Sequence, residues 1–347
     1  MLSPSLRDLV SGQKAGVGAS LLRAGLRLCE IPYSAAVDWR NRRYDRGHAM
    51  SHRVGVPVVS VGNVTLGGTG KTPVVEWLAR WYSEQGLRPA IVSRGYGAKL
   101  GEENDEARVL AANLPGVPRV QNPDRVAGAE RAIAEYGADR IVLDDGFQHR
   151  RLARDLDLVL LDALEPFGWG HVVPRGTLRE PLTGLGRADV LMLSRADLVS
   201  PEERARIRKE ALKYAPQAGW AEVVHRPRTL LSSTGETQPL ALLRDMPVAA
   251  FCGLGNPTGF RRTLDGLGCR VVDFKTFPDH HSYPPADLDQ LSAWVDSLDV
   301  AAVLCTQKDL VKIPRGTLSG RFLWAVGVGV EFLSGQAELE ARLAAAV

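Results

Sequence analysis

Residues 58–73 read VVSVGNVTLGGTGKTP, an apolar β-branched segment followed by a glycine-rich turn and a Gly-Lys-Thr triplet. A helical pattern continues from about Val74 to Gln85. Glycines let backbone N–H groups close around phosphate oxygens, and the N-terminus of the next helix adds free donors and a favourable dipole. The order of strand, turn and helix therefore predicts a phosphate-binding loop.

This loop departs from the usual pattern G-x-x-x-x-G-K-[ST], because Thr65 stands where the first glycine is expected. The nearest upstream glycine, Gly62, lies three residues before this position. The alternative to a phosphate-binding loop is a glycine-rich turn in which Gly-Lys-Thr occurs by chance. In a phosphate loop, Lys71 reaches the β- and γ-phosphates and the Thr72 hydroxyl holds Mg²⁺. We expect nucleotide binding by Gly67, Gly68, Thr69, Gly70, Lys71 and Thr72.

The length of 347 residues predicts two domains, each large enough for its own core. The composition is that of an ordinary globular protein, with 45% hydrophobic and 24% charged residues. A net charge of +3 is too small to indicate a nucleic-acid partner. The four cysteines show no C-x-x-C spacing, so we expect buried, reduced thiols and neither a zinc site nor a disulfide framework.

The first 53 residues carry nine Lys or Arg against four acids. On a helical wheel Arg23, Arg27 and Glu30 share one face, while Val17, Leu21, Leu22, Leu26, Leu28 and Cys29 cover the opposite one. Pro32 is expected to break this pattern before the arginine-rich run 40–46. Such a segment suits the surface of an anionic membrane, and packing on the protein's own core is the alternative. No apolar run of about 18 residues predicts a spanning helix.

From Val56 onward, short β-branched runs alternate with helical stretches, which is typical of a parallel sheet with crossover helices. We expect strands at 56–61, 89–93, 139–144, 156–162 and 189–194, with helices at 74–85, 124–136 and 201–214. The polar, turn-rich stretch 222–247 is a plausible boundary. Beyond it we expect strands at 247–252, 270–274, 300–305 and 322–328, helices at 257–267 and 285–297, and a terminal helix. The predicted fold is α/β, a P-loop NTPase-like parallel sheet (residues 55–222, preceded by a basic amphipathic segment 1–54) with a smaller α/β domain (223–347).

The predicted strand 139–144 ends in two carboxylates, Asp144 and Asp145. Ligands of open α/β sheets collect at the carboxyl ends of strands, and an acidic strand end helps to hold Mg²⁺ beside a phosphate loop. We therefore expect Thr72, Asp144 and Asp145 at a metal site. The following residues, which include Gln148 and His149, offer donors to phosphate or sugar oxygens, unless they form a solvated loop.

Four further clusters carry polar groups. Ser93-Arg94-Gly95-Tyr96-Gly97 follows a predicted strand and is expected to form part of a ligand-facing turn, whereas Asn104-Asp105-Glu106 is expected in a polar loop. In the run Pro278-Asp279-His280-His281, adjacent histidines rarely bind one ion, so an acid–base histidine oriented by Asp279 is favoured over zinc. Arg175 and Arg179 either clamp phosphate or are surface charge.

Taken together, these residues resemble one family, the tetraacyldisaccharide 4′-kinases of lipid A biosynthesis. The resemblance rests on the loop from Gly62 to Pro73, Ser93–Gly97, Asp124-Arg125, Asp144–His149, Leu178–Leu182, Gly253–Pro257, Phe277–His281 and Thr306–Asp309. These motifs extend in order from about residue 20 to residue 330. The family's loop has the same offset glycine spacing.

The resemblance implies an ATP- and Mg²⁺-dependent kinase. It would transfer the γ-phosphoryl group to the 4′-hydroxyl of a tetraacylated glucosamine disaccharide 1-phosphate, giving lipid IVA. It also implies a peripheral protein on the cytoplasmic face of the bacterial inner membrane, with the N-terminal segment contacting lipid. No nucleic-acid partner is implied.

The resemblance also implies residue roles. An Asp in a Gly-Asp-Glu-Pro loop of the family is the general base, which corresponds to Asp105 here, although Asn104 and Ala107 replace the family's Gly and Pro. His280 would assist Asp105, and Asp145 is the fallback base. Lys71, Asp145 and Arg179 complete the catalytic set. The residues assigned to the substrate are Asn63, Arg94, Tyr96, Gln148, His149, Arg179 and Glu180.

Two other functions compete with a lipid kinase. A P-loop GTPase or metallochaperone would read guanine with Asn-Lys-x-Asp, a pattern that residues 306–309 (TQKD) and 194–197 (SRAD) match only in part. A nonenzymatic nucleotide-binding module at the membrane would leave the acids, His280 and the arginines without roles.

Overall fold

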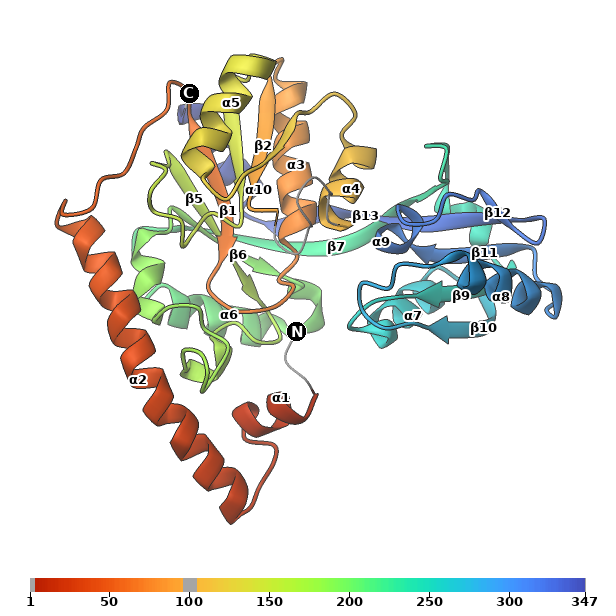
Figure 1. Ribbon diagram of the computed structural model, residues 1–347, viewed down its shortest axis with the longest axis horizontal. Helices are drawn as coiled ribbons and strands as arrows, with labels where there is room; N and C mark the ends of the chain where they lie inside the picture. The colour runs from red at the N-terminus through yellow and green to blue at the C-terminus, as the bar shows by residue number, and fades with distance from the viewer. Residues whose placement is uncertain (1–3, 96–104, 347) are drawn as a thin grey trace. The chain divides into compact units, whose positions relative to one another are not determined.

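The computed structural model describes residues 4–95 and 105–346 and divides the chain into two compact units (Figure 1). Unit 1 comprises Met1–Arg94, Gly116–His225 and Val330–Val347, and unit 2 comprises Gly95–Pro115 and Arg226–Gly329. The sequence places all of 223–347 in the second domain, whereas the structure returns residues 330–347 to unit 1. Helix α10 (Gln336–Ala345) buries Leu339 and Leu343 there, and Arg342 donates to the carbonyl of Asp189.

Unit 1 is built on a parallel sheet, which confirms the predicted fold class. Its order is β7-β6-β5-β1-β4-β2-β3, and every neighbouring pair is parallel. The strands are β1 (Val58–Asn63), β2 (Pro89–Ser93), β3 (Arg119–Gln121), β4 (Arg140–Asp144), β5 (Leu156–Asp162), β6 (Val190–Ser194) and β7 (Gly219–Leu231). Five of them lie within two residues of the predicted strands, and the short β3 and the long β7 are not predicted.

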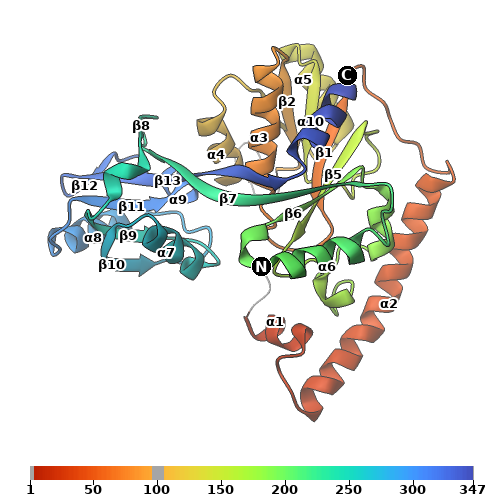
Figure 2. The same ribbon diagram turned by 180° about the vertical axis from the view of Figure 1, so that it is seen from behind.

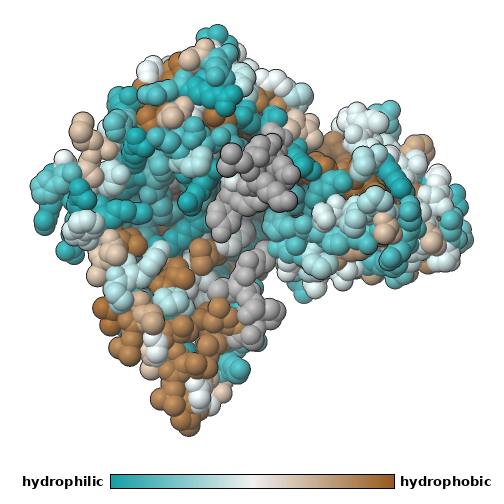
Figure 3. Space-filling model, viewed as in Figure 1, coloured by the Kyte–Doolittle hydropathy of each residue, from teal (hydrophilic) through white to brown (hydrophobic). Residues whose placement is uncertain are grey.

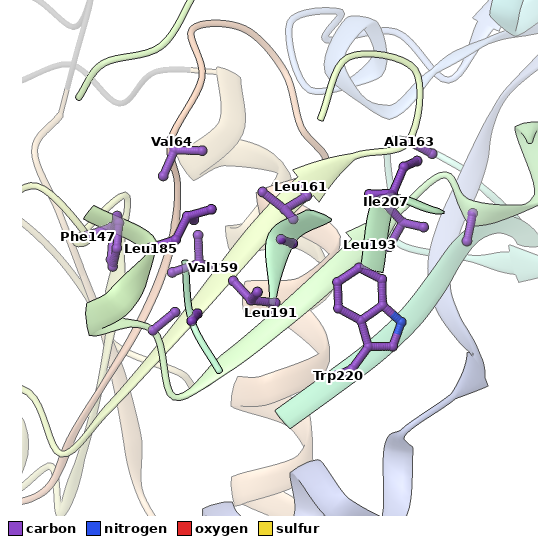
Figure 4. Packing of buried hydrophobic residues seen from close by; sticks show 14 of the residues in the cluster. Val64, Phe147, Val159, Leu161, Ala163, Leu185, Leu191, Leu193, Ile207 and Trp220 are labelled. Atoms are coloured by element: carbon purple, nitrogen blue, oxygen red, sulfur yellow. The ribbon is translucent and has the colours of Figure 1, made fainter. Parts of the chain in front are cut away.

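Helices cover both faces of this sheet (Figures 1 and 2). Helix α5 (Arg125–Tyr136) packs on Ile141 and Leu143, and α6 (Pro201–Ala211) packs on Leu191 and Leu193 of the same face. Helix α3 (Lys71–Glu84) contacts β1, β2 and β4. Figure 4 shows the core beneath α6, where side chains from β5, β6, β7 and the loops at their ends meet.

The part of unit 2 that follows β7 repeats the alternation of strand and helix. Parallel strands β9 (Pro247–Cys252), β10 (Arg270–Thr276), β11 (Ala302–Thr306) and β13 (Arg321–Ser334) form the order β10-β9-β11-β13. Short strands β8 (Thr237–Gln238) and β12 (Thr317–Leu318) pair antiparallel with β7 and β13. The helices of this part are α7 (Pro257–Gly266), α8 (Pro285–Asp296) and α9 (Gln307–Leu310), and the earlier segment of unit 2 contributes α4 (Asp105–Asn113). Strand β9 and the starts of α7 and α8 confirm the prediction.

The predicted boundary stretch 222–247 does contain the change of unit, after His225, but its first half is not the expected run of turns, because β7 continues through it to Leu231. Val223, Val224 and Leu230 are fully buried, and these apolar positions hold the strand in place across the polar run 225–228. A turn begins only after Leu231, where β7 pairs with β8. The unit boundary at His225 therefore falls inside a strand.

The N-terminal segment folds as α1 (Pro4–Ser11) and a single long helix, α2 (Val17–Asp45). The expectation that Pro32 ends the helical pattern is wrong, because Pro32 lies inside α2. An interior proline costs about 3 kcal/mol, and contacts on both sides of it offset this cost. Glu30 accepts from the Val172 N–H, Tyr33 donates to the Arg179 carbonyl and Asn41 donates to Glu180. Within the described part of the chain, no helix combines the length and the hydropathy needed to cross a bilayer.

Candidate active site

The glycine-rich loop connects β1 to α3 and closes with a left-handed residue. Gly70, the residue before α3, has φ +82°, and Gly67 has φ +110°, backbone conformations that L side chains rarely adopt. Helix α3 begins at Lys71, three residues earlier than predicted. Lys71 and Thr72 therefore occupy the first turn of the helix, where free backbone N–H groups attract phosphate.

Lys71 makes the polar contacts at the mouth of this loop. Its Nζ donates to Asn63 Oδ1 at 3.3 Å and lies 3.3 Å from Asp145 Oδ1. Asn63 is fully buried, and its Nδ2 donates to the Thr65 carbonyl at 2.9 Å. The ammonium group is thus held beside the loop in a defined position, ready to meet a phosphate oxygen.

Arg179 reaches the same carboxylate from a different segment. Its Nη1 donates to both oxygens of Asp145 at 2.9 and 2.8 Å, and its Nε donates to the Thr65 carbonyl at 3.1 Å. The backbone also joins the two segments, because the Arg179 N–H donates to the Val64 carbonyl at 2.7 Å and Thr65 bridges to Leu178. We call Asn63, Lys71, Asp145 and Arg179 the phosphate-loop cluster.

The two acids at the end of β4 lie beside β1, as predicted, with Asp144 paired to Val61 in the sheet. Asp145 follows in a left-handed conformation, φ +56°, which turns the chain toward the loop. Burial alone raises the pKa of Asp145, but Lys71 and Arg179 together hold it below its ordinary value. Its carboxylate therefore stays ionised at neutral pH.

Glu180 anchors a second layer of contacts behind this cluster. Its buried carboxylate accepts from Gln148 at 2.9 Å, from Asn41 at 3.0 Å and from Arg187 at 2.8 Å. Gln148 in turn donates to the Asn63 carbonyl. Asn41 and Arg187 were missed from sequence, because their partners lie far along the chain and no local pattern marks them. This layer connects α2 to the phosphate loop.

Gly62, the glycine that lies too early for a standard phosphate loop, has a packing role. It is part of β1, and a Cβ there would lie 2.5 Å from Cβ of the fully buried Phe147. The offset glycine therefore lets the segment after Asp145 approach β1.

His225 is a further residue that sequence reasoning did not select. A Cβ at Gly70 would lie 2.1 Å from His225 Cε1, so the imidazole packs directly on the end of the loop. His225 Nε2 is buried and has no hydrogen-bond partner among the described residues. Burial, helped by the nearby Arg195, lowers the pKa of His225 to about 4, so the ring is neutral at pH 7.

Of the remaining predicted substrate residues, the structure describes His149, after β4, and Arg94, after β2. Burial and the charge of Arg125 lower the pKa of His149 to about 4, and its Nε2 also has no partner within the described chain. Arg94 is exposed at the end of β2, and Tyr96 lies outside the described residues. Arg175, considered as a second phosphate clamp, instead donates to the Val10 carbonyl, so only Arg179 meets the loop.

A second set of polar groups belongs to unit 2. Asp105 begins α4 and does not lie in a loop as predicted. Its Oδ2 accepts from His280 Nδ1 at 3.0 Å and from Lys312 Nζ at 3.2 Å. His280 lies 4.0 Å from Asp279, so its close partner is Asp105 and not the neighbouring Asp279 expected from the residues alone. We call Asp105, His280 and Lys312 the Asp105 cluster.

The two adjacent histidines point to different partners. His280, at φ +61°, contacts Asp105, whereas His281 Nε2 lies 2.5 Å from Asp287. No group of three His, Cys, Asp or Glu residues in the described ranges is arranged to hold a metal. All four cysteines are free, and Cys29, expected to be buried, is exposed on α2.

This chemistry suits phosphoryl transfer. The phosphate-loop cluster presents two fixed cations and a helix N-terminus to an anionic ligand, and the Asp105 cluster presents a carboxylate oriented by an imidazole. Positioning and charge stabilisation of this kind supply most of the rate enhancement in phosphoryl transfer.

Comparisons with known proteins point in the same direction. The family model described as tetraacyldisaccharide-1-P 4′-kinase matches residues 22–347. A tetraacyldisaccharide 4′-kinase of Anaeromyxobacter sp. strain K is 41% identical, over 96% of this chain and 93% of the relative. One from Desulfatibacillum aliphaticivorans is 35% identical, over 94% of this chain and 93% of the relative.

Among solved structures, LpxK from Aquifex aeolicus in complex with ATP is similar. It is 30% identical, superposes with a TM-score of 0.75, and the match covers 94% of this chain and 99% of that one.

Proposed function

The chain belongs to the tetraacyldisaccharide-1-P 4′-kinase family, and on that premise we propose which of its residues carry the reaction. It is an ATP-dependent phosphotransferase that acts on the 4′-hydroxyl of a tetraacyldisaccharide 1-phosphate in lipid A biosynthesis. The GTPase or metallochaperone alternative is not favoured, because the family match covers nearly the whole chain. The contact of Lys71 and Arg179 with one carboxylate beside the phosphate loop is the observation that carries the proposed roles.

ATP is held by the glycine-rich loop, residues 67–72, with its phosphates at the N-terminus of α3. Lys71 and Arg179 lie on either side of Asp145, which keeps both cations in place before the nucleotide binds. As charge develops on the transferred phosphoryl group, both can donate to its oxygens at little cost of reorganisation.

The residues at the end of β4 and the start of α3 fit Mg²⁺. Thr72 offers a hydroxyl, and Asp144 and Asp145 offer carboxylates at adjacent strand and helix ends. Mg²⁺ prefers such oxygen ligands and usually completes its shell with water and substrate phosphates, so a dedicated protein cage is not required. The ion would neutralise charge on the phosphates. Asp144→Asn should raise the Mg²⁺ concentration needed for half-maximal rate, and an unchanged requirement would contradict this role.

Asp105 accepts the proton of the sugar hydroxyl as its oxygen attacks the γ-phosphorus and ADP leaves. A free hydroxyl is a poor nucleophile, so a carboxylate within hydrogen-bond reach lowers the barrier. His280 and Lys312 both donate to Oδ2 of Asp105, which fixes the carboxylate, and Oδ1 accepts from no side chain among the described residues. The proposed substrate site is completed by Asn63, Arg94, Tyr96, Gln148, His149 and Glu180. Glu180 is buried and acts through Gln148, which donates to it.

The test of the base is a comparison of two neighbouring acids. Asp105→Asn should lower kcat for phosphoryl transfer from ³²P-labelled ATP by about 10²–10⁴, the usual contribution of a general base. Glu106→Gln is the matched control, because Glu106 pairs with Lys308 on the surface and should retain most activity. Equal losses, or near-normal turnover of Asp105→Asn, would remove Asp105 from this role.

We also propose that unit 1 associates peripherally with the cytoplasmic face of the inner membrane through α2. The apolar face of the helix is turned away from the protein, with Leu21 67% and Leu28 71% exposed. Its charged face is bound to unit 1, since Arg23 donates to the Lys14 carbonyl and Glu30 contacts His171. Figure 3 shows this apolar surface in brown over the N-terminal half of α2.

This arrangement gives a direct test by flotation with vesicles. Leu21→Glu/Leu28→Glu should reduce binding at least about tenfold, because charged side chains replace apolar ones in the interface. Leu198→Glu, at an exposed leucine elsewhere on unit 1, is the control and should bind normally. If the double variant floats like the wild type, α2 does not insert.

A further inference from the structure

The C-terminal half of α2 carries a surface pocket of about 360 Å³ that the reaction does not use. It is lined mainly by Ala35, Trp39, Arg42, Arg43, Arg46 and His48. Asp38 is the one carboxylate in its wall. Three arginines against one acid make this a site for an anion.

These arginines are not engaged elsewhere. Within the described chain, Arg42, Arg43 and Arg46 pair with no carboxylate, and the nearby Asp45 is held by Arg150 at 2.7 Å. The guanidinium of Arg43 lies 5.0 Å from the centre of the Trp39 ring, a cation–π contact. Guanidinium groups match the geometry of phosphate oxygens, and no carboxylate among the described residues occupies these donors.

The pocket lies on the same face of α2 as the exposed apolar residues. Positions 21, 28, 35, 39, 42 and 46 are separated by three, four or seven residues, which places them in one row along a helix. The row begins with exposed leucines, passes Trp39, which is 63% exposed, and ends in arginines. Figure 3 shows this change along α2 from apolar (brown) to hydrophilic (teal).

We propose that this pocket binds the phosphate of an anionic phospholipid headgroup while the preceding turns of α2 lie among the acyl chains. The inference rests on the proposed membrane association and adds a specific lipid site to it. The order of residues along the row is what a lipid leaflet requires, because tryptophan prefers the boundary between acyl chains and headgroups.

The dimensions agree with this placement. Leu28 and Trp39 are eleven residues apart, about 16 Å along a helix. The hydrocarbon layer of one leaflet is about 15 Å thick, half that of the bilayer. A helix that enters obliquely would therefore place Leu28 within the acyl chains and Trp39 with its arginines at the headgroups. A nucleic-acid ligand would not account for the apolar half of the row.

The test compares flotation with neutral phosphatidylcholine vesicles and with vesicles that also contain phosphatidylglycerol. Arg42→Gln/Arg46→Gln should weaken binding to the anionic vesicles by about 25-fold, about fivefold for each arginine, and leave binding to neutral vesicles unchanged. Asp38→Asn should act in the opposite direction and strengthen binding to anionic vesicles severalfold. Phosphoryl transfer to detergent-dispersed substrate should stay at the wild-type rate in both variants, which would show that they are folded.

The matched control is Arg244→Gln/Arg262→Gln, which removes two exposed arginines from unit 2. An equal loss in this control would show a general charge effect and overturn the pocket. So would equal flotation of the wild type with both kinds of vesicle, or a loss for Arg42→Gln/Arg46→Gln on neutral vesicles. If the wild type floats with neither vesicle, the membrane association itself fails.

Trp39 gives an independent readout of headgroup binding. The difference in fluorescence between wild type and Trp39→Phe should shift to shorter wavelength on adding anionic vesicles and should not change when inorganic phosphate is added instead. A shift with inorganic phosphate alone would indicate a free-anion site and overturn the lipid assignment.

Discussion

The phosphate-loop cluster and the Asp105 cluster both hold a carboxylate between two nitrogen-bearing side chains, but they are fixed by different means. In the phosphate-loop cluster the backbone sets the geometry, through left-handed Gly70 and Asp145 and through the hydrogen bond from the Arg179 N–H to Val64. In the Asp105 cluster side chains set it, since His280 and Lys312 converge on a helix terminus from separate segments.

This difference predicts different sensitivities. A backbone-defined site should fail when the chain is forced into another conformation, whereas a site defined by side chains should weaken in proportion to the contact that is removed. Within the Asp105 cluster the two donors differ in burial, because the side chain of His280 is 62% exposed and that of Lys312 is 6% exposed.

Apart from removal of the proposed base itself, the largest effect is expected for Gly70→Ala. The new methyl group would lie 2.1 Å from His225 Cε1, and alanine at φ +82° adds about 1–2 kcal/mol of strain. The loop or His225 must move, so kcat/KM for ATP should fall at least about a hundredfold, the cost of a misplacement near 1 Å. Steady-state kinetics and ATP titration would measure this loss.

A second variant separates the steric contact from the strain. Gly70→Ala/His225→Ala removes the clash but retains the left-handed alanine, so it should recover part of the lost activity. If the loss of kcat/KM in the double variant, expressed as a free energy, equals the sum of the losses in the two single variants, His225 does not set the position of the loop.

An intermediate effect is expected on stability in acid. His225 has a pKa of about 4 in the folded protein and an ordinary value of 6.5 when unfolded. Between these values the unfolded chain binds a proton that the folded chain does not, so stability falls as the pH decreases from 6.5 to 4. The contribution is on the order of 3 kcal/mol at most, and His149 acts in the same direction.

Urea unfolding at several pH values would check this. His225→Gln should lose less stability than the wild type between pH 6.5 and 4, because glutamine does not titrate. If the free energy of unfolding changes equally with pH in the two proteins, His225 takes up its proton in the folded state as readily as in the unfolded state. The backbone-defined loop would then not depend on a neutral imidazole.

The sequence predicts the phosphate-loop cluster better than the Asp105 cluster. Lys71 and Asp145 belong to local motifs, a strand followed by a loop and a strand that ends in acids, and adjacent parallel strands bring such ends together. Lys312 and Asp105 are 207 residues apart, and neither stands in a pattern that indicates the other. Tertiary packing decides such pairs.

The incorrectly predicted elements have a similar origin. Pro32 and the polar run 225–228 are local signals for interruption, yet α2 and β7 continue through them. In both cases contacts on either side of the interruption hold the element together. Local propensity is outweighed there by burial and hydrogen bonds that involve distant residues.

The smallest effect, and the sharpest test of the comparison, is expected for Lys312→Met. Lys312 is nearly buried, donates to Asp105 at 3.2 Å and lies 3.8 Å from the buried Asp309. Its loss leaves His280 as the side chain that still contacts Asp105 among the described residues. Methionine retains most of the volume. We expect kcat to fall roughly tenfold while KM for ATP is unchanged, because only the orientation of the base is affected.

Lys308→Met is the matched control, since Lys308 is 34% exposed and pairs with the half-exposed Glu106, a contact worth about 1 kcal/mol or less. A thousandfold loss for Lys312→Met, or a raised KM for ATP, would show that the Asp105 cluster is as intolerant of change as the phosphate loop, and the distinction between the two clusters would fail.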